Sequence, residues 1–498
     1  MSMVALSYDF PSIMLRPTNA LRLALCLLIL VCAPTCARTG KEVDRARNVV
    51  VISLCSVRAD HMSLYGYARA TTPALANFSK DAWVFSHAVT QWPKTVPAFA
   101  ALLTGRYGHS NRVMRVTPGQ RLADREITLA EVLRDSGFDT AAFISSGALH
   151  DGTNVFQQGF GRVEETFRSK EPFETATHRA VAWIEERAEK PFFAWVHYNN
   201  AHAPYLAPGA PADVFVDDAF YDPAPQVRVN AAPRFRVAVP ADHANFQQIM
   251  RADIGGIPPR ARLPGRPNEL AFYVARYDAG ILGADRTIAP LLEALRRLGR
   301  LDDTVVALVG DHGESLGEHD YYFQHGRFPY DDNLRVPLLI RPPGGVARRE
   351  IGEPVATFRL APTLLDLVGI RAPAEMEATS LLPRIQGEER FRTVFSESGY
   401  QYDYTLSMRD QRWKLIFVPN AFDQAVMRGG VHELYDLVAD PGELEDLSAS
   451  RPEVVTELSA PLQKWSRPWI RQAYKLVENV DITDDETRAR LRALGYIE

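Results

Sequence analysis

Short continuous apolar runs alternate along the chain with longer segments in which apolar residues recur at helical spacing. Arg47–Val57 (RNVVVISLCSV) is a nearly continuous β-branched run, which is typical of a central strand buried on both faces. Helical patterns then precede apolar strands, at 128–137 before 138–145, 177–190 before 191–198, and 289–299 before 303–313. This alternation predicts a mostly parallel α/β sheet with helices on both faces and ligand sites at the carboxyl ends of its strands.

The alternation changes in two places. Between Pro204 and Leu270 it fades into a Pro- and Ala-rich stretch, which we interpret as an insertion or lid, or alternatively as an irregular loop. After Gly369, segments 392–398, 405–410 and 411–418 resemble antiparallel strands, and 434–447 and a C-terminal helix follow. We therefore expect a large α/β domain over 46–385, with the insertion at about 204–270, and a small subdomain over 386–498.

The segment Lys94–Gly105 (KTVPAFAALLTG) is almost wholly apolar after its first two residues. One interpretation is a short buried helix with Thr95 as its N-cap, Pro97 in its first turn and Gly105 as its C-cap. The other is that the Thr95 hydroxyl lies at a helix N-terminus, where free backbone N–H groups favour an anionic ester.

Residues 1–37 predict a signal peptide, because Arg16 and Arg22 precede an apolar run that begins at Leu23 and ends in small residues. We expect cleavage after Ala37, with lipidation of Cys36 or an uncleaved anchor as alternatives. Each alternative exports the domain to the periplasm or the cell exterior, with membrane contact only through this segment or a lipid.

Only one of the four cysteines, Cys55, lies beyond the signal segment, so no internal disulfide is expected. Burial as a small hydrophobe is the default explanation for such a thiol. The net charge of −5 over 498 residues shows no basic excess, and we expect no nucleic-acid partner.

Reactive side chains follow three of the predicted strands. Cys55 ends the first, His197 and His202 follow the strand near 192–196, and Asp311 and His312 follow the strand near 305–309. An Asp-His pair at a strand end indicates two ligands of a metal site, although such pairs also occur as surface polar residues. Three further groups nearby have no clear spacing and are either outer groups of the site or solvated: Glu314, Glu318 and His319.

Six segments together resemble the sulfatase family of the alkaline phosphatase superfamily, in that family's order. They are 49–78, 95–108, 310–320, 334–344, 360–370 and 434–447. The ending LRALGYIE is similar to the tails of bacterial members, so the resemblance spans about residues 46–498. It implies an ester hydrolase with a large, mostly parallel sheet flanked by helices and a small C-terminal antiparallel subdomain.

Two positions depart from the family pattern. Cys55 stands where these sulfatases have an Asp that binds the divalent cation, and Thr95 stands where a Cys or Ser becomes formylglycine. Oxidation of Thr gives only a ketone, so Thr95 cannot become formylglycine. The resemblance therefore implies that the Thr95 oxygen attacks phosphorus directly, as in the phosphodiesterase and headgroup-transferase branches of the superfamily. A phosphate ester is therefore favoured over a sulfate ester as substrate.

Cys55, Asp311 and His312 form a sulfur, oxygen and nitrogen set for one divalent cation, with zinc or manganese favoured over calcium. The alternative is that Cys55 only fills a strand end from which a ligand was lost, with no metal bound.

The resemblance also implies catalytic roles for two histidines. His202 matches the histidine that assists the leaving group, and His325 matches a Lys or His that faces the substrate oxyanion. Arg327 shares that task through its fixed charge, and Lys94 either lowers the pKa of Thr95 or points to solvent. We expect His197 to be a hydrogen-bonded structural residue, and Arg58 and Asp60 to form an ion pair.

The sequence thus predicts an exported metal-dependent hydrolase of a small-molecule, lipid or glycan ester, with Thr95, His202 and His325 as catalytic residues. Two alternatives remain: an inactive binding protein with the same fold, and a conventional sulfuric ester hydrolase.

Overall fold

The computed structural model describes residues 46–114, 121–145, 155–166, 174–187, 190–222, 261–263, 265, 269–389, 393–400, 403–418 and 431–470. The chain divides into Met1–Glu42 and Val43–Glu498, and the second unit contains all of these residues. The predicted signal segment and most of the predicted insertion, residues 223–260, lie outside them. No helix among the described residues combines the length and apolarity needed to cross a membrane.

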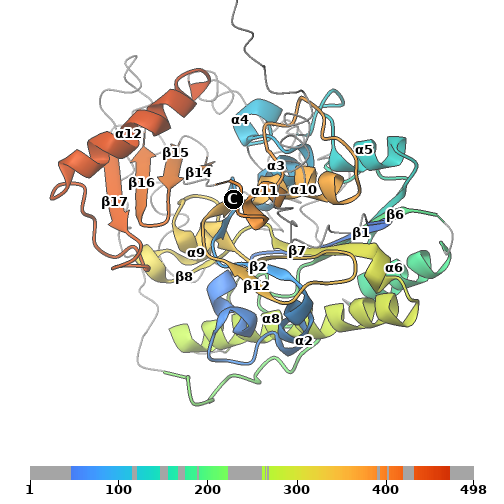
Figure 1. The fold of residues 1–498 in the computed structure, drawn as a ribbon. Helices are drawn as coiled ribbons and strands as arrows, with labels where there is room; N and C mark the ends of the chain where they lie inside the picture. Colours follow the sequence, from blue (N-terminus) through green and yellow to red (C-terminus); the bar gives the residue numbers. More distant parts are fainter. Residues whose placement is uncertain are drawn as a thin grey trace, which may run out of the picture. The chain divides into compact units, whose positions relative to one another are not determined.

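An eight-stranded sheet forms the centre of the second unit, in the order β12-β2-β11-β7-β1-β6-β4-β5 (Figure 1). Its strands are β1 (Asn48–Leu54), β2 (Trp83–Phe85), β4 (Asp139–Ile144), β5 (Arg162–Glu165), β6 (Phe192–Tyr198), β7 (Thr304–Gly310), β11 (Leu338–Arg341) and β12 (Arg349–Ile351). All neighbouring pairs are parallel except those of β11, which runs antiparallel to both β2 and β7. The predicted fold class, a mostly parallel α/β sheet, is confirmed.

Helices cover both faces of this sheet (Figure 1). One face carries α3 (Thr95–Thr104), α5 (Leu129–Asp135) and α10 (Leu360–Leu367), and the other carries α2 (Pro73–Phe78), α6 (Thr175–Glu185) and α8 (Leu270–Arg297). In β1, Val49 and Val51 pack on the α3 side, whereas Val50, Ile52 and Leu54 pack on the α8 side. The β-branched run is therefore buried on both faces, as its composition predicts.

The helix α8 spans 28 residues, although the sequence pattern predicted only its last part, 289–299. The difference arises because the part of α8 before residue 289 buries polar side chains, Arg276, Asp278 and Asp285, which obscure the amphipathic period. Backbone also packs closely on it: a Cβ added at Gly280 would lie 2.7 Å from Asn200 O. The loop after β6 is thus seated directly on α8.

A four-stranded antiparallel sheet follows, in the order β14 (Val394–Tyr400), β15 (Asp403–Arg409), β16 (Trp413–Val418) and β17 (Val431–Asp436). The helix α12 (Pro452–Ser466) packs on β15 and β16 (Figure 1). The three predicted strands and the C-terminal helix are found, while β17 overlaps the segment from Leu434 for which no strand was predicted. The division of the chain at residue 385 stays a prediction.

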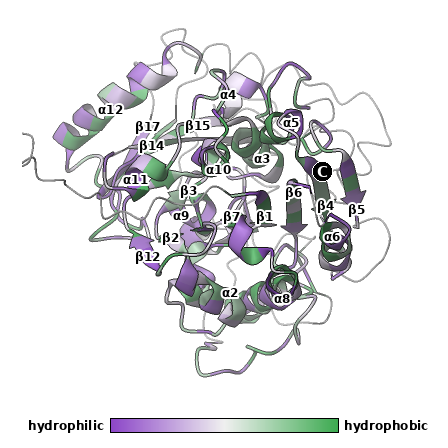
Figure 2. Cartoon of the chain, turned by 45° about the vertical axis from the view of Figure 1, so that its right-hand side comes forward, coloured by the Kyte–Doolittle hydropathy of each residue, from purple (hydrophilic) through white to green (hydrophobic). Residues whose placement is uncertain are grey.

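Short elements complete the connections. They are α4 (Gly108–Asn111), α9 (Asp331–Leu334), α11 (Leu382–Ile385), β3 (Ala88–Val89), β8 (Ser315–Leu316), β9 (Tyr322–Gln324), β10 (Arg335–Val336) and β13 (Val355–Ala356). Figure 2 shows α3 as an almost wholly hydrophobic helix, whereas α12 mixes polar and apolar residues. All ten residues of this apolar helix, α3, are buried in the core.

Candidate active site

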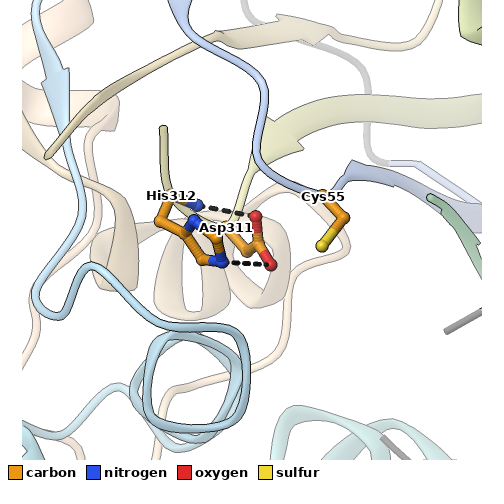
Figure 3. Close-up of side chains that lie close together, drawn as sticks. All are labelled: Cys55, Asp311 and His312. Carbon is orange, nitrogen blue, oxygen red and sulfur yellow. Dashed lines mark hydrogen bonds and ion pairs between the residues drawn. The ribbon is translucent and has the colours of Figure 1, made fainter. Parts of the chain in front are cut away.

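Two adjacent parallel strands end at the same edge of the sheet. In β1 and β7, Leu54 pairs with Gly310, and the Asp311 N–H donates to the Leu54 carbonyl at 3.1 Å. The residues that follow, Cys55 and Asp311, are therefore neighbours at the carboxyl ends of the strands (Figure 3).

Cys55, Asp311 and His312 are all buried, and one potential ligand atom of each lies within 4.8 Å of the others. Asp311 Oδ1 accepts hydrogen bonds from the Ser56 N–H at 3.0 Å and the His312 N–H at 2.7 Å. Asp311 Oδ2 lies 3.4 Å from His312 Nε2 and has no hydrogen-bond partner within the described part of the chain. A buried carboxylate oxygen left in this state fits a cation ligand.

His312 is held in the tautomer that a metal ligand requires. Its Nδ1–H donates to the Gly313 carbonyl at 2.7 Å, which leaves the lone pair on Nε2. This nitrogen accepts a hydrogen bond from Thr95 Oγ1 at 3.1 Å. One divalent cation therefore fits between Asp311 Oδ2, His312 Nε2 and the Cys55 thiol.

Burial, and then the charge of Asp311, raise the pKa of the Cys55 thiol well above its ordinary value. Without a positive charge nearby the thiol therefore stays neutral. A cation between the three residues supplies that charge and favours the thiolate form.

Thr95 is the first residue of α3, and Lys94 is the N-cap. The interpretation of Thr95 as the N-cap is therefore wrong by one position. Its hydroxyl caps no backbone group but bonds to His312 Nε2 and lies 3.8 Å from Cys55 Sγ. Pro97 in the first turn and a left-handed Gly105 at the C-cap are found as predicted.

The two predicted catalytic histidines lie beside the cluster. The His325 ring centroid is 4.1 Å from that of His312 and 5.6 Å from that of His202. His202 Nδ1–H donates to the Ala203 carbonyl at 2.7 Å, and His325 Nδ1–H donates to Glu314 Oε2 at 3.1 Å. Each histidine therefore keeps Nε2 for other contacts.

Glu314 was left open by the sequence as either an outer group of the site or a solvated residue, because its spacing gave no sign of the contact with His325. It is fully buried, so the alternative that it is only solvated is wrong for this residue. The nearest signal in the sequence is its place two residues after His312.

Lys94 and Arg327 add positive charge next to these groups. They are 9% and 2% exposed, so Lys94 does not extend into solvent. A Cβ added at Gly326 would lie 3.6 Å from Lys94 Nζ, which places the lysine against the loop of His325 and Arg327.

The remaining predicted polar residues are structural. His197 Nδ1 lies 2.9 Å from Ser53 Oγ, and burial lowers the pKa of His197 to about 4, so its ring is neutral. The expected ion pair between Arg58 and Asp60 forms at 2.8 Å. Arg58 also pairs with Glu318 at 2.6 Å, so Glu318 helps to fix the loop after β1.

A family model described as Sulfatase matches residues 47–370, and one described as N-sulphoglucosamine sulphohydrolase, C-terminal, matches residues 317–467. An N-acetylglucosamine-6-O-sulfatase of Bacteroides thetaiotaomicron is 23% identical over 89% of each chain. A choline-sulfatase of Rhizobium meliloti is 27% identical, with 76% of this chain and 77% of the relative covered.

Two solved structures share the fold. The phosphonate monoester hydrolase from Silicibacter pomeroyi has a TM-score of 0.65 at 21% identity, covering 85% of this chain and 95% of that one. A protein in complex with its substrate D-glucosamine-2-N,6-O-disulfate has a TM-score of 0.64 at 20% identity, covering 87% and 98%.

Proposed function

Because this chain belongs to the sulfatase family of ester hydrolases, we propose that it cleaves a phosphate ester with Thr95 as nucleophile, beside one divalent cation. One observation carries the proposal. The Thr95 hydroxyl lies at the N-terminus of α3, 3.1 Å from His312 Nε2 and 3.8 Å from Cys55 Sγ, at the edge of the ligand set.

Cys55, Asp311 and His312 would hold the cation, and their mixed donor set favours zinc or manganese over calcium. A cation held there supplies positive charge that favours the deprotonated form of a nearby hydroxyl and withdraws charge from ester oxygens. With a cation held there, Thr95 would not need a separate general base beside it.

The chain's own residues account for the remaining chemistry. The Thr95 hydroxyl proton passes to solvent, and Thr95 Oγ1 forms a bond to phosphorus as the ester P–O bond breaks. His202, in its doubly protonated form, gives the leaving alcohol a proton from Nε2 and later regains one from solvent, and Glu314 orients His325 toward the phosphoryl oxygens. Water then cleaves the bond between Thr95 and phosphorus, which restores the hydroxyl and releases phosphate.

The helix N-terminus and the buried charges of Lys94 and Arg327 suit an anionic ester. The substrate we propose is a small-molecule, lipid or glycan phosphoester met after export from the cytoplasm. Phosphate is preferred to sulfate because Thr95 cannot form the formylglycine aldehyde. A conventional sulfuric ester hydrolase is the second candidate, since relatives of this chain are named as sulfatases.

The test compares p-nitrophenyl phosphate, bis(p-nitrophenyl) phosphate and p-nitrophenyl sulfate as substrates of the zinc-loaded protein. Thr95→Ala is expected to lower kcat for the phosphoesters by about 10³-fold or more, because the nucleophile is lost. The matched control is Thr104→Ala, which changes a buried threonine of the same helix. The Thr104 hydroxyl donates to the Ala100 carbonyl at 2.6 Å and accepts from Asn111 Nδ2 at 3.4 Å.

Unchanged turnover in Thr95→Ala would remove Thr95 from the mechanism. Turnover of the sulfate ester alone would favour the second candidate. Absence of turnover with all three esters in protein that binds zinc would favour a binding protein with the sulfatase fold.

A further inference from the structure

The residue directly after Cys55 has an unusual backbone conformation. Ser56 is fully buried and has a φ of 57°, in the left-handed region that non-glycine residues rarely adopt. Such a conformation costs on the order of 1–3 kcal/mol and persists only where surrounding groups hold it. The contacts of Ser56 therefore identify what maintains it.

One side chain holds the backbone on both sides of Val57. The Tyr277 hydroxyl donates to the Ser56 carbonyl at 2.7 Å and accepts from the Arg58 N–H at 2.9 Å. Tyr277 is fully buried, and this burial raises the pKa of its phenol well above the ordinary value, so the hydroxyl keeps its proton. It is a permanent donor to Ser56.

Tyr277 reaches Ser56 from the opposite layer of the fold. It lies on α8, whereas Thr95, which contacts Cys55 and His312, belongs to α3 on the other face of the sheet. Its ring is fixed by edge contacts with His61 at 5.4 Å and Tyr205 at 6.1 Å between centroids. The hydroxyl is thus presented to the end of β1 in one orientation.

Ser56 in turn orients Asp311. The Ser56 N–H and the His312 N–H both bond to Asp311 Oδ1, and this leaves Oδ2 as the oxygen for a cation. Ser56 also follows Cys55 in the chain, so rotation about its backbone would move the thiol relative to the carboxylate. The positions of both Asp311 and Cys55 therefore depend on the Ser56 conformation that Tyr277 holds.

We propose that Tyr277 is a positioning residue of the cation site, whose hydroxyl holds Ser56 in the left-handed conformation and thereby fixes Cys55 and Asp311 in ligand geometry. The inference rests on the proposed function only in taking Cys55, Asp311 and His312 as the cation ligands. Tyr277 thus acts on cation binding through Ser56, without itself being a ligand.

The experiment measures the zinc affinity of the full chain by competition with a chelator, with bound metal counted by mass spectrometry. Tyr277→Phe removes one oxygen atom and is expected to weaken zinc binding by about 10- to 100-fold, the usual effect of losing a partner that orients a ligand. Tyr273→Phe is the matched control, because it makes the same change one helical turn away, where, among the residues that the structure describes, the hydroxyl accepts a hydrogen bond from Leu263 N at 3.4 Å and none from the loop after β1. Its zinc affinity is expected to stay within about twofold of wild type.

A second variant separates positioning from a general loss of structure. Glycine adopts positive φ at no steric cost, so Ser56→Gly in the Tyr277→Phe background is expected to recover at least half of the lost affinity on a logarithmic scale. Thermal unfolding of the metal-free proteins checks that each variant is folded.

Wild-type affinity in Tyr277→Phe would overturn the inference and leave the proposed function intact. Equal losses in Tyr277→Phe and Tyr273→Phe, or no recovery with Ser56→Gly, would also overturn it. A wild-type protein that binds no zinc would instead remove the cation site, and with it both the proposed function and the inference.

Discussion

At the scale of single residues, Cys55 is the one sulfur donor of the candidate cation site. Its sulfur is a soft donor, whereas calcium and magnesium prefer carboxylate and carbonyl oxygens. The Asp311 oxygen suits either kind of cation, and the His312 nitrogen suits zinc without excluding a harder cation as strongly as sulfur does. The choice of metal therefore depends on one side chain.

Replacing that side chain tests the point. Cys55→Asp is expected to lower zinc affinity and to raise magnesium or calcium affinity, each by about tenfold or more, because an oxygen replaces the sulfur. Competition binding with the three metals measures the change, and Cys55→Ser serves as the control that removes the sulfur without adding charge. An unchanged preference for zinc in Cys55→Asp would show that the thiol is not a ligand.

The sequence predicted the residues at strand ends well, for a physical reason. Parallel strands end at one edge of a sheet, so Cys55 and Asp311 had to meet once their strands were recognised. Glu314 and Tyr277 could not be found this way, because their partners, His325 and Ser56, are fixed by loop conformation and by packing between layers. The sequence assigned Thr95 to the N-cap, one position before its place as the first residue of α3, because an N-cap residue and a first-turn residue look alike in sequence.

At the scale of elements, α8 organises two loops of the site. Tyr277 holds the loop after β1, and Gly280 lets the loop that carries His202 approach the helix. The sequence pattern missed this part of α8 because polar and small residues, such as Asp278 and Gly280, are buried there among the apolar ones. These residues stabilise the fold through specific contacts, and they do not follow the regular apolar spacing by which a helix is recognised in sequence.

Gly280→Ala is expected to lower both kcat/KM and thermal stability, because the added Cβ would lie 2.7 Å from Asn200 O and 2.8 Å from Ala201 Cα. Moving this backbone displaces His202, and overpacking of this kind costs about 1–3 kcal/mol. Gly352→Ala is the control, since its Cβ would meet nothing within 4 Å. Steady-state kinetics and calorimetry of both variants measure the effects, and wild-type behaviour of Gly280→Ala would contradict the role of the close contact.

Another residue of α8, Asp285, makes the stability of the protein depend on pH. Asp285 accepts from the N–H groups of Ala74 at 3.0 Å and Leu75 at 2.8 Å, at the start of α2. Burial raises the pKa of Asp285 from 3.8 to about 6, so the folded state keeps a proton that the unfolded state loses. Its contribution to stability is therefore complete below about pH 4 and falls as the pH rises to about 6.

The difference in unfolding free energy between wild type and Asp285→Asn isolates this effect. We expect the difference to change by about 2 kcal/mol between pH 4 and pH 6, with wild type becoming less stable relative to the variant, and to level off above about pH 7. Urea unfolding at several pH values measures it. A constant difference across that range would contradict the raised pKa.

At the scale of the whole molecule, the C-terminal sheet is tied to the segment that carries His325. Lys414 on β16 is fully buried and pairs with Asp331 at 2.8 Å and Glu443 at 2.7 Å. Asp331 begins α9, directly after the loop from His325 to Tyr330. The antiparallel sheet therefore supports the segment that carries His325.

Lys414→Met is expected to lower the free energy of unfolding by about 3–5 kcal/mol, because two buried carboxylates lose their shared cation. Lys464→Met, at an exposed position of α12, should change it by less than about 0.5 kcal/mol. Chemical denaturation of both variants gives the comparison. A small effect of Lys414→Met would show that the remaining pairing with Arg409 suffices for Asp331.

All ten residues of α3 are buried, and Thr95 is the first of them. Backbone amides in such a helix exchange with solvent hydrogen mainly when the entire core opens, so those of α3 should be among the slowest in the protein. The hydroxyl that we propose as the nucleophile thus lies on a backbone that opens only with the core, and its position would be fixed before a substrate arrives. Under that proposal, an ester would have to adjust to the threonine, because the helix that carries the threonine is held too firmly to move.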